Sequence, residues 1–163
     1  CGWMSEFLSL MKFEVIATTI SQSSINQIEQ RISSIEAKGV EATLSCYETP
    51  MESVSDFLKD KNVLPVDAVF VFEALHHAYD WEQTLQSAFS SLNPGGWLVI
   101  CNEPNVLHTF ISYRIAKLSN THEIGLSRAS LVNNLKRIGF SNINVYSNRI
   151  DFWVAPHWIA AQK

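Results

Sequence analysis

Several features that mark secreted, membrane-spanning or nucleic-acid-binding proteins are scarce or missing in this sequence. The 163 residues include three cysteines without CxxC spacing, which argues against a disulfide framework and a cysteine-rich zinc site. No apolar run is long enough to span a bilayer, and no signal-peptide pattern is present. Basic residues do not cluster and the net charge is -4, so neither nucleic acid nor an anionic membrane is the expected partner. These absences favour a cytoplasmic protein.

A strand and a complete glycine-rich loop are also missing ahead of the first predicted helix. The chain begins Cys1-Gly2-Trp3-Met4-Ser5-Glu6-Phe7-Leu8, which is typical of a helix start. An α/β nucleotide-binding fold normally places a buried strand and a glycine-rich turn before that helix. We therefore expect an N-terminally truncated chain in which Gly2 is the last glycine of such a turn.

Strands and helices alternate along the rest of the chain, which predicts a single α/β domain over residues 1–163. Apolar residues make up 47% of the sequence, as expected for a buried sheet. Apolar or β-branched runs predict strands at 13–20, 40–46, 66–72 and 97–101, with a closing strand pair at 141–147 and 149–159. The run over 66–72 is continuous, which is typical of a strand covered on both faces. Helices are predicted from Ser21 to near Gly39 and over 52–61, 80–92 and 127–138.

The connection over residues 103–126 is longer than an ordinary link between a strand and a helix. Its apolar spacing predicts an extra helix over 106–118. Long connections at the carboxyl ends of strands often carry substrate contacts, so we expect a substrate-side insertion here.

Polar groups gather where the predicted strands end, which is where ligands bind in open parallel sheets. The candidate catalytic residues are His76, His77 and Glu103. An imidazole could remove a proton from a substrate hydroxyl, although one histidine could equally close the turn while the other lies at the surface. Glu103 could orient a substrate or accept a proton, or it could lie at the N-terminus of a following helix. The five histidines show no ligand spacing, so no metal site is predicted.

Four segments together resemble class I S-adenosylmethionine-dependent methyltransferases. The longest reads DAVFVFEALHHAYDWEQTLQSAFSSLNPGGWLVICNEPN, and its ALHH turn and EP pair are similar to those of a bacterial subgroup. The others are CGWMSEFL, CYETP and LVNNLKRIGFSNINVY. The resemblance covers nearly the whole chain. It implies a Rossmann-like, mostly parallel sheet with helices on both faces and a C-terminal antiparallel strand.

The resemblance also implies which positions contact S-adenosylmethionine. Gly2 would lie beside the methionine moiety, and Thr19 takes the place of the acid that binds the ribose hydroxyls, which a hydroxyl cannot fully replace. Cys46 takes the place of the acid that meets the adenine amino group, and Glu48 could compensate. The implied cofactor-binding residues are Gly2, Thr19, Cys46, Tyr47, Glu48, Phe72 and Glu73.

The resemblance thus implies methyl transfer from S-adenosylmethionine to a small-molecule or carbohydrate acceptor. The altered positions Thr19 and Cys46, together with the expected truncation, predict weak cofactor binding. They favour the alternative of a catalytically inactive remnant or interaction domain, whereas His76, His77 and Glu103 favour an enzyme. A nicotinamide dehydrogenase is disfavoured, because no full GxGxxG is present and no acid closes the first predicted strand. The oligomeric state does not follow from the sequence.

Overall fold

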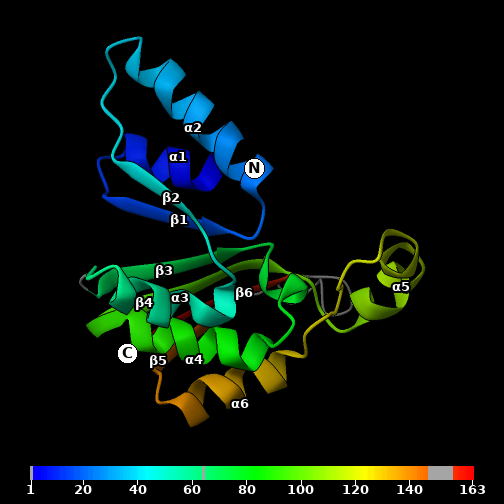
Figure 1. The fold of residues 1–163 in the computed structure, drawn as a ribbon. Helices are drawn as coiled ribbons and strands as arrows, with labels where there is room; N and C mark the ends of the chain where they lie inside the picture. Colours follow the sequence, from blue (N-terminus) through cyan, green and yellow to red (C-terminus); the bar gives the residue numbers. More distant parts are fainter. Residues whose placement is uncertain (1, 64, 147–155) are drawn as a thin grey trace. The chain divides into compact units, whose positions relative to one another are not determined.

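The computed structural model describes residues 2–63, 65–146 and 156–163 of the chain, which form strands and helices in alternation (Figure 1). They divide into two compact units, Cys1–Met51 and Glu52–Lys163. Both contain parallel strand pairs, and the second ends in an antiparallel strand. The predicted α/β class with a C-terminal antiparallel strand is thereby confirmed. Each unit is described by itself below.

The first unit is a β-α-β arrangement preceded by a helix (Figure 1). Its strands are paired in parallel, with α1 and α2 packed against them. The elements are α1 (Trp3–Leu10), β1 (Val15–Thr19), α2 (Gln22–Glu36) and β2 (Leu44–Glu48), and the short 3-10 turn η1 (Met51–Ser53) follows at the boundary.

Helix α2 forms where its sequence predicts it. The Ser21 hydroxyl accepts a hydrogen bond from the backbone N–H of Ser24 at 3.3 Å, which closes the first turn. Ile25, Ile28 and Ile32 lie on one face of the helix and are buried. This face packs on β1 and β2, so the isoleucine stripe is part of the core of the unit.

The second strand was predicted too early in the sequence. It runs over Leu44–Glu48 instead of 40–46, because its partner β1 begins only at Val15, which pairs with Leu44. Cys46 therefore lies in the middle of the strand and Glu48 at its carboxyl end. Glu48 is the register partner of Thr19, the last residue of β1.

The second unit is built on a four-stranded sheet in the order β3-β4-β6-β5. Strands β3 and β4 are parallel, and β6 is antiparallel to both β4 and β5. A closing antiparallel pair is thus present, but its second strand runs over His157–Gln162 and not over 149–159. Residues 147–155 of the predicted pair lie outside the described part of the chain. The elements are α3 (Val54–Asp60), β3 (Val66–Phe72), the 3-10 turn η2 (Leu75–His77), α4 (Trp81–Ser91), β4 (Leu92–Glu103), α5 (Leu107–Ser119), α6 (Arg128–Ile138), β5 (Ser141–Tyr146) and β6 (His157–Gln162).

A layer of three helices, α3, α4 and α6, covers one face of this sheet (Figure 1). Leu85 of α4 and Leu131 and Leu135 of α6 are fully buried, as are Leu98 and Ile100 of β4. Burying side chains of this size removes apolar surface from water at roughly 1.5–3 kcal/mol each. These contacts hold β4, and therefore the carboxyl end of this strand, in a fixed place.

Strand β3 differs from the prediction of a strand covered on both faces. Val71 is buried, whereas Phe70 is 45% exposed. Among the described residues of the second unit, β3 pairs with β4 alone, and the α3–α4–α6 layer covers one of its faces. The apolar run therefore indicated a strand correctly but did not indicate how much of it is covered.

Candidate functional site

The carboxyl ends of β3 and β4 lie next to each other, because Phe72 pairs in parallel with Cys101. Glu73, just after β3, and Asn102, the second-last residue of β4, adopt left-handed backbone conformations, with φ of 45° and 56°. Asn102 Nδ2 donates a hydrogen bond to the Glu73 carboxylate. Left-handed conformations of residues other than glycine cost free energy and are common at functional sites. They turn both strands toward the same polar cluster.

The centre of this cluster is the carboxylate of Glu103, which is fully buried. Its Oε1 accepts hydrogen bonds from the backbone N–H groups of Ala74 at 2.6 Å and Leu75 at 2.9 Å. Its Oε2 accepts from the backbone N–H of His76 at 3.1 Å and lies 2.9 Å from Nδ1 of the same histidine. The carboxylate thus satisfies the N–H groups that open turn η2.

His76 is buried and its imidazole is oriented by this carboxylate. Because Glu103 already accepts three backbone N–H groups, we assign the His76 proton to Nδ1, which then donates the fourth hydrogen bond. Its other ring nitrogen, Nε2, lies 3.9 Å from Oε2 of Glu123. His76 therefore lies between two carboxylates, with Nδ1 on the side of Glu103 and Nε2 on the side of Glu123.

The ring of His77 contacts that of His76, with centres 3.9 Å apart and planes inclined by 42°, but its side chain is 48% exposed. Its Nδ1 lies 3.0 Å from the backbone carbonyl oxygen of His122, which can only accept a hydrogen bond. Nδ1 therefore carries the proton. The Nε2 atom of His77 has a lone pair, and His77 is the more accessible of the two adjacent histidines.

A third histidine and a second carboxylate complete the cluster. His108 lies in the first turn of α5, and its Nε2 is 3.1 Å from Oε2 of Glu123. Oε1 of Glu123 lies 3.5 Å from Nδ1 of His77. Three histidines from two segments thus surround one carboxylate, whose side chain is 19% exposed.

The loop that carries Glu123 is held by hydrogen bonds from the backbone N–H groups of the three residues that follow Glu123. The N–H of Ile124 donates to the carbonyl of His76 at 3.2 Å, and that of Leu126 donates to the carbonyl of Pro104 at 3.0 Å. The N–H of Gly125 donates to Oγ1 of Thr109 at 2.7 Å. A Cβ on Gly125 would lie 1.9 Å from the Asn105 carbonyl oxygen, so only glycine fits this close approach.

Two other titratable side chains near Glu103 have shifted pKa values. Burial, followed by the charge of Glu103, raises the pKa of the Cys101 thiol. Burial lowers the pKa of His157, whose Nε2 lies 2.6 Å from the Leu126 carbonyl and whose buried Nδ1 has no hydrogen-bond partner among the described residues. Both groups therefore favour their neutral forms beside the cluster.

Most of the sequence-predicted cofactor residues lie in the first unit. Thr19 ends β1, and its hydroxyl accepts a hydrogen bond from the N–H of Ser21 at 3.3 Å. Cys46 and Tyr47 are half-buried within β2, and Glu48 is exposed at its end. Burial, followed by the charge of Glu29, raises the pKa of Cys46.

Gly2 has a structural role of its own. It caps α1 with φ of 73°, in the left-handed region that favours glycine. A Cβ here would lie 2.4 Å from Cγ1 of Ile28. Packing between α1 and α2 therefore accounts for a glycine at this position.

Phe72 and Glu73, the remaining predicted cofactor residues, lie in the second unit. The ring of Phe72 packs edge-on against Trp158, with centres 6.3 Å apart. Glu73 follows it with the left-handed backbone described above. Both lie beside the Glu103 cluster along the chain, at the carboxyl end of β3.

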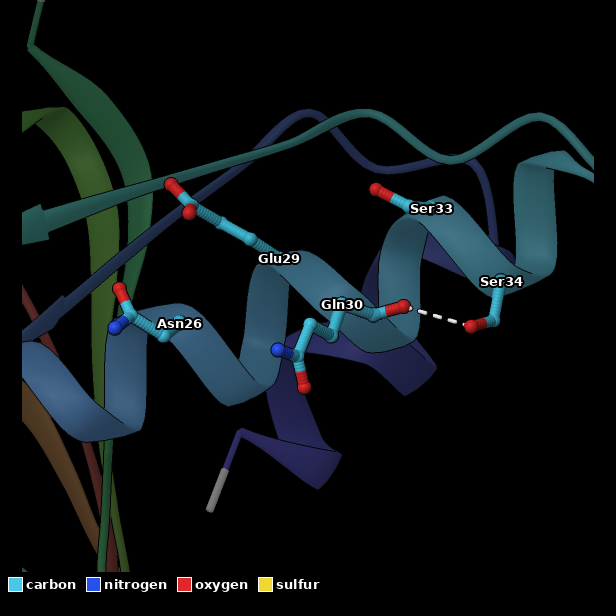
Figure 2. Close-up of a pocket in the computed structure, with 5 residues that line it drawn as sticks. All are labelled: Asn26, Glu29, Gln30, Ser33 and Ser34. Carbon is cyan, nitrogen blue, oxygen red and sulfur yellow. Dashed lines mark hydrogen bonds between the residues drawn. The ribbon is translucent and has the colours of Figure 1, made fainter.

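A hollow on α2 in the first unit is a poor candidate site. It is lined by exposed polar side chains that spread along the helix without converging (Figure 2): Asn26, Glu29, Gln30, Ser33 and Ser34. Ser34 uses its hydroxyl to donate to the Gln30 carbonyl of the same helix, at 2.8 Å. None of the sequence-predicted site residues lines this hollow.

The structure brings together the three predicted catalytic residues, and it adds two that the sequence reasoning missed. Glu123 was not singled out, although it lies in the connection predicted to carry substrate contacts. His108 was considered only through sequence spacing, which gave no signal. Their convergence depends on the path of the chain through residues 104–126, which no local pattern specifies.

Comparison with known proteins identifies the family to which the chain belongs. A family model described as a methyltransferase domain matches residues 1–100. Magnesium protoporphyrin IX methyltransferase from Synechocystis, solved with bound SAH, is 16% identical with a TM-score of 0.69, over 99% of this chain and 69% of that chain. A SAM-dependent methyltransferase from Methanosarcina mazei is 17% identical with a TM-score of 0.69, over 99% and 87% of the two chains.

A third similar structure is an S-adenosylmethionine dependent methyltransferase from Mesorhizobium loti. It is 13% identical with a TM-score of 0.66, over 99% of this chain and 86% of that chain. A search of curated proteins found no match. Among the described residues, no helix has both the length and the apolar character needed to cross a membrane. The family match and the shared fold confirm the resemblance inferred from the sequence motifs.

Proposed function

Because the chain belongs to the methyltransferase domain family, we propose that it transfers a methyl group from S-adenosylmethionine to a hydroxyl of a small-molecule or carbohydrate acceptor. The observation that carries the proposal is the hydrogen-bonded pair of Glu103 and His76 at the carboxyl end of the parallel strands, where open α/β sheets bind ligands. Two of the similar solved structures also carry bound SAH or SAM.

The proposed reaction needs little acid-base chemistry from the protein. The cofactor supplies a methyl group that its sulfonium already activates. As the acceptor oxygen bonds to the methyl carbon, the carbon–sulfur bond breaks and its electron pair stays on sulfur. The acceptor must lose one proton, and Nε2 of the half-exposed His77 is the proposed base. Alignment and exclusion of water would supply most of the rate.

Glu103 is a positioning residue in this proposal. Its four hydrogen bonds to residues 74–76 fix turn η2 and the ring of His76, which contacts the ring of His77. A group held in this way loses little orientational freedom when the acceptor binds.

The resemblance implied that Glu48 could compensate for the adenine acid replaced by Cys46, but its position beside Thr19 leads us to propose that it binds the ribose hydroxyls instead. It is exposed at the carboxyl end of β2 and is the register partner of Thr19, the position at which the family carries an acid. A carboxylate can accept two hydroxyl groups at once, whereas the Thr19 hydroxyl is already bonded to the N–H of Ser21. The other cofactor contacts, at Gly2, Cys46, Tyr47, Phe72 and Glu73, are proposed from the family resemblance.

The test is formation of S-adenosylhomocysteine from S-adenosylmethionine in the presence of a panel of sugars, glycosides and small phenols. We expect the parent protein to turn over at least one acceptor. His77→Gln should be at least ~100-fold slower, because it lacks the general base. Glu48→Gln should have a higher KM for S-adenosylmethionine. Glu41→Gln, an exposed change before β2, is the matched control for Glu48 and should leave KM unchanged. Turnover that is equal in the parent and in His77→Gln contradicts the assigned base.

A catalytically inactive interaction domain is the second candidate, favoured by a threonine at the position of the ribose acid. It predicts that S-adenosylmethionine neither binds in titration calorimetry nor yields product with any acceptor. Cofactor binding that is weakened by Glu48→Gln would reject this second candidate.

A further inference from the structure

The geometry points to a divalent transition-metal site, best matched to Zn²⁺, formed by Nε2 of His76, Nε2 of His108 and the carboxylate of Glu123. The inference rests on the proposed function only in its last step, the role of the metal ion. The sequence predicted no metal site, because the three side chains come from separate segments: turn η2, the first turn of α5 and the loop before Leu126.

The three ligand atoms are close enough to bind one ion. They lie within 4.8 Å of one another, and Oε2 of Glu123 is 3.1 Å from Nε2 of His108 and 3.9 Å from Nε2 of His76. Tetrahedral zinc, with bonds of about 2.0–2.2 Å, places its ligand atoms roughly 3.3 Å apart. Closing the cluster on an ion therefore requires side-chain movements of about 1 Å. It also requires the proton on Nε2 of His108, which donates to Glu123 in this structure, to move to Nδ1 or to solvent.

The surroundings of His76 are those of a metal-bound histidine. Such a histidine usually donates its other N–H to a carboxylate or carbonyl, which fixes its tautomer and makes the free nitrogen more basic. Glu103 does this for His76, at 2.9 Å from Nδ1, and it is itself held by three backbone N–H groups. This arrangement leaves Nε2 of His76 on the side of Glu123, 3.9 Å from its Oε2.

Glu123 and His108 are also fixed before any ion binds. The backbone N–H groups of Ile124, Gly125 and Leu126 are bonded to His76, Thr109 and Pro104, so the loop that carries Glu123 is tied to η2, α5 and the end of β4. The N–H of His108 donates to the Asn105 carbonyl at 2.9 Å, which sets the first turn of α5. Ligands that are held in place lose little conformational entropy on binding.

The donor set favours a transition metal over Mg²⁺ or Ca²⁺. Two imidazole nitrogens and one carboxylate suit Zn²⁺, whereas Mg²⁺ and Ca²⁺ prefer oxygen ligands alone. Two histidines and a glutamate leave a coordination position open, as in catalytic zinc sites. The side chain of His108 is 33% exposed, so a small molecule can reach this position. On the proposed function, the open position takes the acceptor oxygen and makes its hydroxyl more acidic.

The test measures metal binding alone, without cofactor or acceptor. The untagged full chain is treated with a chelator, dialysed and titrated with Zn²⁺ in a calorimeter. We expect one ion per chain, and binding at least ~100-fold weaker in His108→Ala and in Glu123→Gln. Glu103→Gln should weaken binding by about 10–100-fold, the usual effect of losing a partner of a ligand. His122→Ala is the matched control. It removes an exposed imidazole next to Glu123 in the sequence but keeps the backbone carbonyl that is bonded to His77.

A second measurement separates a real site from loss of folding. Co²⁺ should give visible absorption bands of a low-coordinate nitrogen and oxygen site in the parent and in His122→Ala, and these bands should be absent in His108→Ala. Circular dichroism should be equal in all variants. Zinc that fails to bind at one ion per chain, or that binds equally to the parent, His108→Ala and Glu123→Gln, would overturn the inference. Zinc binding without methyl transfer would leave the site standing and reject the proposed function instead.

Discussion

The carboxylate of Glu103 lies 2.9 Å from Nδ1 of His76, although 27 residues separate them in the sequence. Strand β4 carries the carboxylate, the turn after the parallel neighbour β3 carries the histidine, and the register of the two strands brings them together. Replacing a buried carboxylate that accepts four hydrogen bonds should lower the stability of the fold. Each buried donor that loses its acceptor keeps the free-energy cost of desolvation without a hydrogen bond to offset it.

Replacing Glu103 with alanine should reduce the free energy of unfolding by about 3–5 kcal/mol. The change leaves the N–H groups of Ala74 and Leu75 and the His76 ring without their acceptor. Urea denaturation measures the effect. Glu82→Ala is the control, since Glu82 is exposed and forms a surface ion pair with Arg137, so its loss should cost less than about 1 kcal/mol. Equal destabilisation by the two changes would contradict this account.

Gly125→Ala should be more destabilising than Gly39→Ala. A Cβ on Gly125 would meet the Asn105 carbonyl, whereas one on Gly39 would meet nothing within 4 Å and suffer only from its φ of 78°. We expect a loss of about 1–2 kcal/mol at Gly39 from backbone strain and a larger loss at Gly125 from the clash. Thermal unfolding of the two variants gives the order, and the reverse order would show that the loop can move away from Asn105.

Stability should fall as the pH falls below about 6.5, the ordinary pKa of histidine, because of His157. Its pKa is lowered in the folded protein by burial, so between pH 6.5 and this lower value the unfolded chain binds a proton that the folded chain does not. The groups facing His157 are the Leu126 carbonyl, Arg128 and Glu103. In urea denaturation from pH 8 to 5, the free energy of unfolding should fall less steeply with falling pH for His157→Gln than for the parent. The difference in slope should be at most about 1.4 kcal/mol per pH unit. Identical pH profiles would remove His157 as the cause.

The Cys46 thiol should react slowly with iodoacetamide at pH 8, and Glu29→Gln should speed the reaction. Burial raises the pKa of Cys46 most, and the negative charge of Glu29 raises it further. Removing that charge lowers the pKa and increases the fraction of reactive thiolate. Peptide mass spectrometry distinguishes Cys46 from the other cysteines. Glu36→Gln, an exposed change at the end of the same helix, should leave the rate unchanged.

Elements with strong local signals were predicted well from the sequence. The helix over Arg128–Ile138 begins after Ser127, whose hydroxyl accepts from the N–H of Ser130, and ends at Gly139 with φ of 118°. The spacing of Asp80 and Gln83 is that of a capping box, in which each side chain accepts the backbone N–H of the other residue. Asp80 does accept the N–H of Gln83, at 2.9 Å, whereas the N–H of Asp80 donates to Glu52 and not to Gln83, at 3.1 Å.

Features that depend on pairing or on distant contacts were predicted less well. The start of β2 is set by its register with β1, which the sequence of residues 40–48 does not contain. His76, His77 and Glu103 were found because they follow predicted strands. Glu123 and His108 were not, because their positions are set by bonds from Ile124, Gly125 and Leu126 to three separate segments.

Three of the four hydrogen bonds that Glu103 accepts come from the backbone and only one from a side chain. Every residue except proline has a backbone N–H group, so the bonds from positions 74–76 to Glu103 do not depend on the side chains there. Folding alone should therefore require glutamate at position 103 but should not require histidine at position 76. In a library of variants selected only for soluble expression, position 76 should accept many residues while position 103 keeps its glutamate. Selection for activity should restore histidine at position 76, so comparing the two selections separates the architectural role of this pair from its chemical role.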